Sequence, residues 1–244
     1  MLDDILVVSG QVHRPIFDNK YSPDQAITKA SFLDKQTRKL VVVFLPWHVP
    51  EWYAKKLQQK LACLRQASLI YYFNESIIAT NTESVVSSFE YIALSIASDV
   101  NELSHRYGYT HIDLLGISLG NVAMCITAEK LKHFNKVIML VPGDSLADPL
   151  WFGWRTRRLR HKLQRSGTTL TRLQKQWDIL APSSHVSTLR GHGVHIILAK
   201  RDRFIPYDFG RQLVRDLLAA HASVTFTESP FGHIATILAY LPDL

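Results

Sequence analysis

A serine flanked by two glycines, in the stretch Gly116-Ile117-Ser118-Leu119-Gly120, is the feature of this sequence best suited to do chemistry. An apolar segment of strand type, residues 111–115, precedes it, and residues 121–131 follow with the apolar spacing of a helix. A sharp strand-to-helix turn exposes a hydroxyl above the sheet edge, and glycines let strand and helix approach closely because they lack Cβ. The pattern therefore predicts a nucleophilic Ser118 beside the free N–H groups of a helix N-terminus.

A serine nucleophile needs a base that removes its proton and a third group that orients this base. Asp202 follows an apolar segment at 194–199, and His233 follows a strand-like segment at 223–227. Loops after parallel strands meet at one edge of the sheet, and Ser118, Asp202 and His233 occur in the order expected for a triad there. The sequence therefore predicts that these three side chains form a Ser-His-Asp triad.

Two alternatives to this triad stay open. Asp144 also follows an apolar strand-like segment, at 136–141, and is the second candidate for the acid. His48 is the second candidate for the base. We favour Asp202 over Asp144 because the residues around Asp202 match an acid loop better.

Strand-like and helix-like segments alternate along most of the chain, and these segments must position the triad. The predicted strands are 4–9, 25–33, 37–45, 68–73, 111–115, 136–141, 194–199 and 223–227. The predicted helices are 50–66, a helix opened by a capping box at Ser87–Glu90 and stopped at Gly108, 121–131, 208–221 and a last helix from His233. This alternation predicts an α/β fold with a mainly parallel, doubly wound sheet and helices on both faces.

One segment interrupts this alternation. Residues 144–192 separate two predicted strands by far more chain than one crossover helix needs. The segment contains Trp151, Trp154 and Trp177, which argues against disorder. We therefore predict that residues 145–192 form a small helical cap over the strand ends, and that residues 1–144 and 193–244 form the α/β core.

Basic residues are concentrated in this predicted cap. The formal net charge of the chain is +7, and the stretch between Trp151 and Trp177 holds no acid. Its cations are Arg155, Arg157, Arg158, Arg160, Lys162, Arg165, Arg172 and Lys175. Most such runs are solvated helix faces. The functional alternative is a positive surface that attracts a phospholipid headgroup, an acyl-carrier phosphate or an anionic membrane.

The overall composition is that of a globular protein. The chain has 244 residues, of which 47% are hydrophobic, and this suits one sizeable α/β domain. Cys63 and Cys125 are expected to be buried small hydrophobes, and we expect neither a disulfide nor a metal site. No nucleic-acid-binding motif is present, so no such partner is expected. The N-terminus lacks a secretory signal and no apolar run reaches the ~18 residues of a membrane span, so we expect a cytoplasmic protein.

From about Lys39 to its end the chain resembles the α/β-hydrolase superfamily, in particular its serine esterase and lipase-like branch with a helical cap. Ser118 fits the nucleophile elbow of that family. Asp202 fits the acid loop, which often reads Asp-x-x-x-Pro, and His233 fits the Gly-His pair before the final helix. The resemblance implies hydrolysis or transfer of acyl groups without a metal or an organic cofactor.

The loop that would complete the oxyanion hole departs from the pattern of the family. The family often has a His-Gly pair after its third strand, whereas residues 45–50 of this chain contain no glycine. We expect the backbone N–H of Leu119 to be one donor and that of Trp47 to be the other, with His48 as the second choice. We also expect His48, Trp151 and Trp154 to line the substrate site, and the tryptophans together to border an apolar cavity above Ser118.

The function expected from these residues is that of a serine hydrolase that cleaves a carboxylic ester or a thioester, with an acyl chain and an anionic head as the suggested substrate. An acyltransferase with the same triad is the first alternative. A non-catalytic ligand-binding protein with this fold is the second. The sequence leaves the acyl length, the leaving group and the oligomeric state open.

Overall fold

The sheet forms the centre of the molecule. In the computed structural model, which describes residues 27–46, 49–73, 82–153 and 156–240, seven strands pair in the order β1-β3-β2-β4-β5-β6-β7. They are β1 (Ile27–Leu33), β2 (Lys39–Phe44), β3 (Ala67–Phe73), β4 (His111–Ile117), β5 (Lys136–Leu140), β6 (Gly193–Ala199) and β7 (Ser223–Ser229). Strand β1 is antiparallel to β3, and every other neighbouring pair is parallel. The predicted fold class is therefore correct; the strand expected at 4–9 lies outside the described residues.

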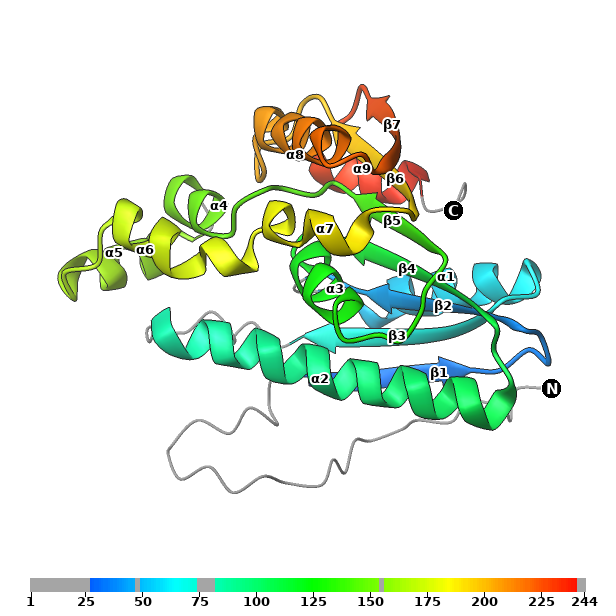
Figure 1. The fold of residues 1–244 in the computed structure, drawn as a ribbon. Helices are drawn as coiled ribbons and strands as arrows, with labels where there is room; N and C mark the ends of the chain where they lie inside the picture. The colour runs from blue at the N-terminus through cyan, green and yellow to red at the C-terminus, as the bar shows by residue number, and fades with distance from the viewer. Residues whose placement is uncertain (1–26, 47–48, 74–81, 154–155, 241–244) are drawn as a thin grey trace, which may run out of the picture.

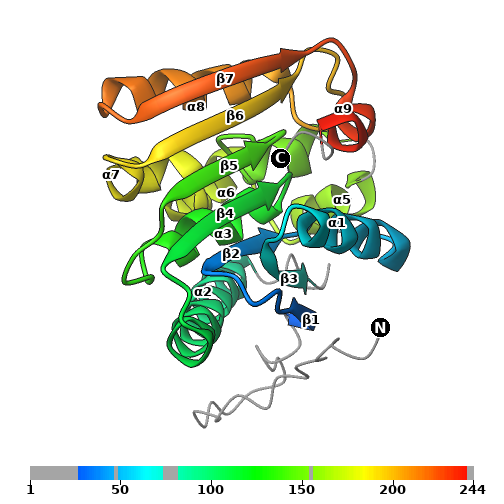
Figure 2. The same ribbon diagram turned by 90° about the vertical axis from the view of Figure 1, so that its right-hand side faces the viewer.

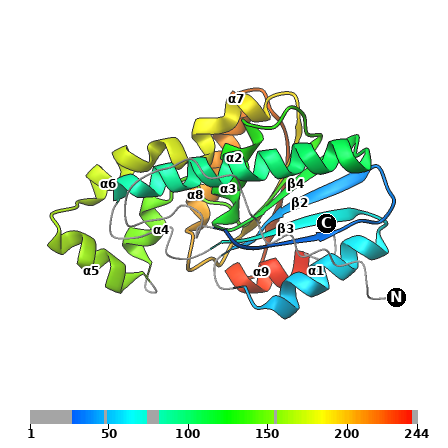
Figure 3. The same cartoon turned by 90° about the horizontal axis from the view of Figure 1, so that it is seen from below.

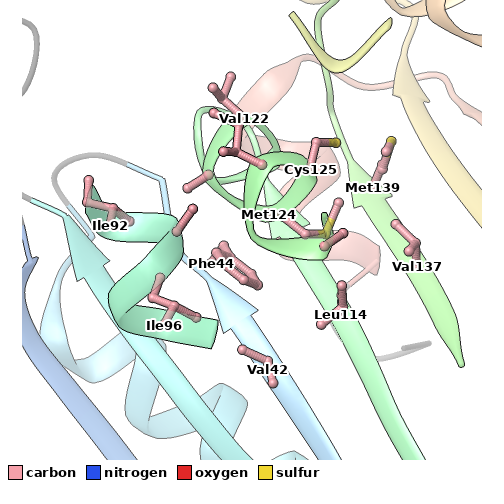
Figure 4. Close-up of a cluster of buried hydrophobic side chains, with 14 of the residues drawn as sticks. Val42, Phe44, Ile92, Ile96, Leu114, Val122, Met124, Cys125, Val137 and Met139 are labelled. Atoms are coloured by element: carbon pink, nitrogen blue, oxygen red, sulfur yellow. The ribbon is translucent and has the colours of Figure 1, made fainter. Parts of the chain in front are cut away.

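Helices cover both faces of this sheet. On one face lie α2 (Thr82–Tyr107), α3 (Gly120–Ala128) and α8 (Tyr207–Ala219), and on the other lie α1 (Glu51–Cys63) and α9 (His233–Tyr240) (Figures 2 and 3). The central strands are buried on both sides, so they are apolar without interruption. In β2, Val42 and Phe44 join the core under α2 and α3, whereas Val41 and Val43 join the core under α1. Figure 4 shows the first of these cores between β2, β4, α2 and α3.

The long segment between β5 and β6 is helical. It contains α4 (Ala147–Phe152), α5 (Arg157–Arg165), α6 (Leu170–Trp177), two short 3₁₀ turns η3 (Asp178–Leu180) and η4 (Pro182–His185), and α7 (Val186–Leu189). In Figure 1, α4, α5 and α6 extend beyond the carboxyl ends of the strands. Leu163 of α5 and Leu173 of α6 belong to the same buried cluster as α2 and α3, so these helices share the main core. The division into a core and a cap at residues 145–192 stays a prediction.

A hydrogen bond from Trp177 connects this helical segment to the start of α2. Its indole is 2% exposed, and its Nε1–H donates to the carbonyl of Thr82 at 2.8 Å. The Thr82 hydroxyl in turn donates to the side chain of Gln176 at 3.0 Å. The first residue of α2 is thus held by a contact 95 residues away along the chain.

Two predictions about local structure were wrong. The helix expected to open with the capping box at Ser87–Glu90 begins at Thr82, and Ser88 instead lies inside α2, where its hydroxyl donates to the carbonyl of Ser84. The predicted stop is correct, since α2 ends at Tyr107 and the next residue, Gly108, has a φ of 71°. Cys63, which was expected to be buried, is exposed because it lies at the end of α1, away from the buried face of that helix. Cys125 is buried as expected.

Among the described residues, no helix combines the length and the apolar character that a bilayer crossing requires.

Candidate active site

Ser118 occupies a sharp bend between β4 and α3. Its φ is 53°, in the left-handed region that a non-glycine residue rarely adopts. Two backbone hydrogen bonds hold it there: its N–H donates to the carbonyl of Leu140 at 2.9 Å, and its carbonyl accepts from the N–H of Asn121 at 3.0 Å. A strained residue that is held by its surroundings is typical of a functional site.

The two glycines allow a close approach of strand and helix, as predicted. A Cβ on Gly120 would lie 2.0 Å from the carbonyl oxygen of Phe44 at the end of β2. A Cβ on Gly116 would lie 2.6 Å from the side-chain oxygen of Asn121. Neither position has room for a side chain, so the N-terminus of α3 can sit directly against the ends of β2 and β4.

Asn121 also holds this bend, and the sequence analysis missed it. Its side-chain NH₂ donates to the carbonyl of Ser118 at 2.8 Å and to that of Leu140 at 3.2 Å. It therefore ties the serine to the neighbouring strand β5 in parallel with the backbone bonds. The only hint in the sequence is an amide side chain at the start of an otherwise apolar helix.

Asp202 and His233 come together with Ser118 at the carboxyl edge of the sheet. The Nδ1 of His233 lies 2.6 Å from Oδ2 of Asp202, and its Nε2 lies 3.0 Å from Oγ of Ser118. The side chains of His233 and Asp202 are only 6% and 3% exposed. A carboxylate only accepts hydrogen bonds, so Nδ1 carries the hydrogen and Nε2 is left to accept the Ser118 hydroxyl hydrogen.

The Asp202 carboxylate is held in place by the turn in which it lies. Its other oxygen, Oδ1, accepts hydrogen bonds from the backbone N–H groups of Phe204 at 2.7 Å and Ile205 at 2.9 Å. The ring of Phe204 also packs against the His233 imidazole, with 5.2 Å between centroids. The turn thus positions the acid and supports the histidine ring at the same time.

Hydrogen bonds hold the loop that carries Asp202 and the loop that precedes His233 in fixed positions. The N–H of Arg201 donates to the carbonyl of Phe231 at 3.2 Å. The buried hydroxyl of Thr236, in the first turn of α9, donates to the hydroxyl of Ser229 at 2.8 Å, which fixes α9 against the end of β7. His233, the first residue of α9, is therefore anchored from both sides.

Asp144, the alternative acid, lies in a different environment. Its Oδ1 accepts a hydrogen bond from the backbone N–H of Ser183 at 2.9 Å. Burial outweighs the opposing effect of the Ser183 hydrogen bonds and raises the pKa of Asp144 to about 6. The structure therefore pairs His233 with Asp202 and ties Asp144 to η4.

The remaining predicted site residues fall into two groups. Leu119 directly follows Ser118 and is the N-cap residue of α3, and the half-buried Trp151 packs against the main core. Trp47, His48 and Trp154 lie outside the described residues.

Two of the described tryptophans, Trp52 and Trp177, lie in different surroundings. Trp52 lies on α1, on the opposite face of the sheet from the core that holds Trp177, and its side chain is 55% exposed. The expectation that the tryptophans jointly border a cavity above Ser118 stays a prediction.

Two histidines that lie three residues apart in the sequence, His192 and His195, have structural contacts. His192 stacks on Phe134 with 3.9 Å between ring centroids, and Nδ1 of His195 lies 2.8 Å from the hydroxyl of Thr225. Among the described residues, no group of three or more His, Cys, Asp or Glu side chains is arranged to hold a metal ion.

Comparisons with known proteins give a clear result for the fold. No model of a known protein family matches the chain, and no curated protein sequence does. Solved structures do match. An esterase from Pyrococcus furiosus aligns over 95% of this chain and 93% of its own, with 13% identity and a TM-score of 0.64. A cold-adapted esterase from an Arctic intertidal metagenomic library aligns over 87% and 83%, with 10% identity and a TM-score of 0.61.

A third solved structure with a similar fold belongs to a longer chain. The acylaminoacyl peptidase of Pyrococcus horikoshii aligns over 88% of this chain and 36% of its own, with 13% identity and a TM-score of 0.60. These esterases and this peptidase have a fold similar to that of the chain. The chain therefore has the α/β-hydrolase fold.

Proposed function

We propose that this protein is a serine hydrolase that cleaves a carboxylic ester through Ser118, His233 and Asp202. The observation that supports this most strongly is the continuous line of hydrogen bonds from the Ser118 hydroxyl to the His233 imidazole, 3.0 Å, and from there to the Asp202 carboxylate, 2.6 Å. The similar fold of esterases from two sources adds to it.

In the proposed reaction, Oγ of Ser118 attacks the acyl carbon while Nε2 of His233 takes the hydroxyl proton. The imidazolium that forms is stabilised by the Asp202 carboxylate, which two backbone N–H groups keep oriented. His233 then returns the proton to the leaving group. Water, activated by the same imidazole, releases the acyl group from Ser118.

The oxyanion would be held at the N-terminus of α3. Leu119 is the N-cap residue of α3, and free backbone donors and the helix dipole favour negative charge at this end of a helix. The loop after β2 starts beside this turn, because Gly120 contacts the carbonyl of Phe44. The N–H of Leu45 already donates to Tyr71, and Pro46 has none. The first N–H that can serve as the second donor is therefore that of Trp47, as we propose, followed by that of His48.

A fluorophosphonate probe tests the proposal directly. We expect the wild-type protein to be labelled covalently on Ser118 and to hydrolyse p-nitrophenyl esters, and both activities to be lost in Ser118→Ala. Asp202→Asn should keep the fold and lower the hydrolysis rate by about 10⁴-fold, because the imidazole then adopts the wrong tautomer.

Unlabelled wild-type protein that still binds fatty acids would contradict the proposal in favour of a binding protein. A set of esters and thioesters of graded acyl length, with and without an anionic group, then defines the preferred substrate. Added alcohols, amines and thiols show whether the acyl group passes to an acceptor other than water.

A further inference from the structure

Helix α5 presents basic side chains on one side and leucines on the other. At 3.6 residues per turn, the basic positions 157, 158, 161, 162 and 165 fall within an arc of about 140°. Arg157, Arg158, His161, Lys162 and Arg165 are all exposed; we call these five residues the α5 basic face. On the opposite side Leu163 is buried and Leu159 packs against the core. The orientation of α5 is therefore set by its leucines, and its cations are displayed to solvent as a group.

Among the described residues, no acidic side chain forms an ion pair with the α5 basic face. The residues from 149 to 177 include no Asp or Glu. Within the described part of the chain, the cations of the α5 basic face and the exposed Arg172 and Lys175 of α6 take part in no ion pair. The nearest acid before them, Asp148, is buried and accepts a hydrogen bond from Gln174.

The α5 basic face also destabilises its own helix. Arg158 and Lys162 are four residues apart and Lys162 and Arg165 are three apart, and like charges at these spacings repel each other. Arg160 differs, because it turns inward and its guanidinium donates to the carbonyl of Trp151 at 2.7 Å. An arrangement that repels itself in isolation gains stability when an anionic surface covers it.

The position of α5 indicates the shape of such a partner. Figures 1 and 3 show α5 at the end of the molecule that extends past the carboxyl ends of the strands, the edge at which Ser118 and His233 lie. Phe152, at the end of the neighbouring α4, is 63% exposed. A row of cations on a projecting helix, with an exposed aromatic ring nearby, suits a plane of anionic headgroups above acyl chains.

We propose that the α5 basic face, together with Arg172 and Lys175, docks this protein onto anionic lipid bilayers. The contact would bring the edge of the sheet that holds Ser118 towards the lipid. The docking itself needs no reaction at Ser118, so its test is independent of the test of the proposed hydrolase activity.

Vesicle co-sedimentation tests the docking. The full chain with Ser118→Ala, which prevents lipid hydrolysis, is mixed with vesicles of 30% phosphatidylglycerol in phosphatidylcholine or of pure phosphatidylcholine. We expect binding to the anionic vesicles only, with loss of binding in about 0.5 M NaCl because salt screens exposed charges. One cation near such a surface is worth about a fivefold change in affinity, so Arg158→Gln/Lys162→Gln/Arg165→Gln should weaken binding about a hundredfold.

A matched control separates the α5 basic face from net charge. Lys55, Lys130 and Lys132 are exposed and lie on α1 or directly after α3. Their triple substitution by Gln removes the same charge and should change vesicle binding by less than about threefold. Both triple variants should keep the far-UV circular dichroism spectrum and the cooperative urea unfolding of the parent protein, which shows that they fold.

Three results would overturn the proposal: no binding of the protein to anionic vesicles at low salt, equal loss of binding in both triple variants, or α5-dependent binding to an acidic polypeptide such as polyglutamate without binding to vesicles. The last would identify an acidic protein as the partner.

Discussion

Replacing Asp144 by Asn tests the assignment of the acid and the energetics of a partly buried carboxylate together. Burial raises the pKa of Asp144 from its ordinary value of 3.8 to about 6, although Ser183 donates a hydrogen bond to it. Asn keeps an oxygen in nearly the same place but carries no charge. The hydrogen bond from Ser183 can therefore survive the substitution, while the cost of burying a negative charge disappears.

The sign of the pH dependence follows from the raised pKa. Between pH 3.8 and about 6 the folded protein holds a proton on Asp144 that the unfolded chain has already lost. The contribution of this group to stability therefore falls as the pH rises through that window. A shift of about two pKa units corresponds to about 3 kcal/mol. The side chain is partly exposed and solvent screens its charge, so we expect about half of this, ~1.5 kcal/mol.

Urea unfolding of the wild type and of Asp144→Asn at pH 4 and pH 8 measures this effect, because other titrating groups cancel in the difference between the two proteins. We expect the stability of the variant relative to the wild type to increase by ~1.5 kcal/mol from pH 4 to pH 8, or about 3 to 6 °C in Tm. A difference that does not change with pH would refute the reasoning. Ester hydrolysis by Asp144→Asn should stay within about threefold of the wild-type rate. A loss as large as that expected for Asp202→Asn would show that Asp144 takes part in catalysis.

Three further predictions concern the scaffold. Gly120→Ala should destabilise the protein by about 3 kcal/mol or more in urea unfolding, because its Cβ would lie 2.0 Å from the carbonyl oxygen of Phe44; a stable variant would mean that α3 can move. His185→Ala should cost about 3 kcal/mol, since the buried imidazole bonds Glu129 at 2.7 Å and a backbone carbonyl at 2.8 Å, and a cost below about 1 kcal/mol would show that these bonds are not formed. Cys63→Ser should abolish the reaction of the native protein with a thiol reagent and leave stability within about 0.5 kcal/mol, whereas a reagent that still reacts would locate the accessible thiol elsewhere.

Much of the fold could be predicted because its signals are local. The run Val41–Leu45 is apolar at every position, and this is the pattern of a strand covered on both faces, as β2 is. The stop of α2 before Gly108 was also visible, because a left-handed residue ends a helix by its own conformation.

Features that depend on contacts between distant segments were missed. The start of α2 was placed too late because the sequence near Ser87 resembles a capping box, whereas the helix is extended to Thr82, which Trp177 and Gln176 hold through hydrogen bonds. The role of Asn121 was missed for the same reason, since one of its two acceptors belongs to β5.

By itself, the sequence determined the alternation of strands and helices, the glycines around Ser118, and the order in which a serine, an acid and a histidine follow their strands. Apolar periodicity and turn residues act over a few neighbouring positions, so they can be read along the chain. Only the tertiary structure decided between Asp202 and Asp144 as the partner of His233. Both acids follow strands that end at the same edge of the sheet, and the choice depends on which turn directs its carboxylate to the imidazole.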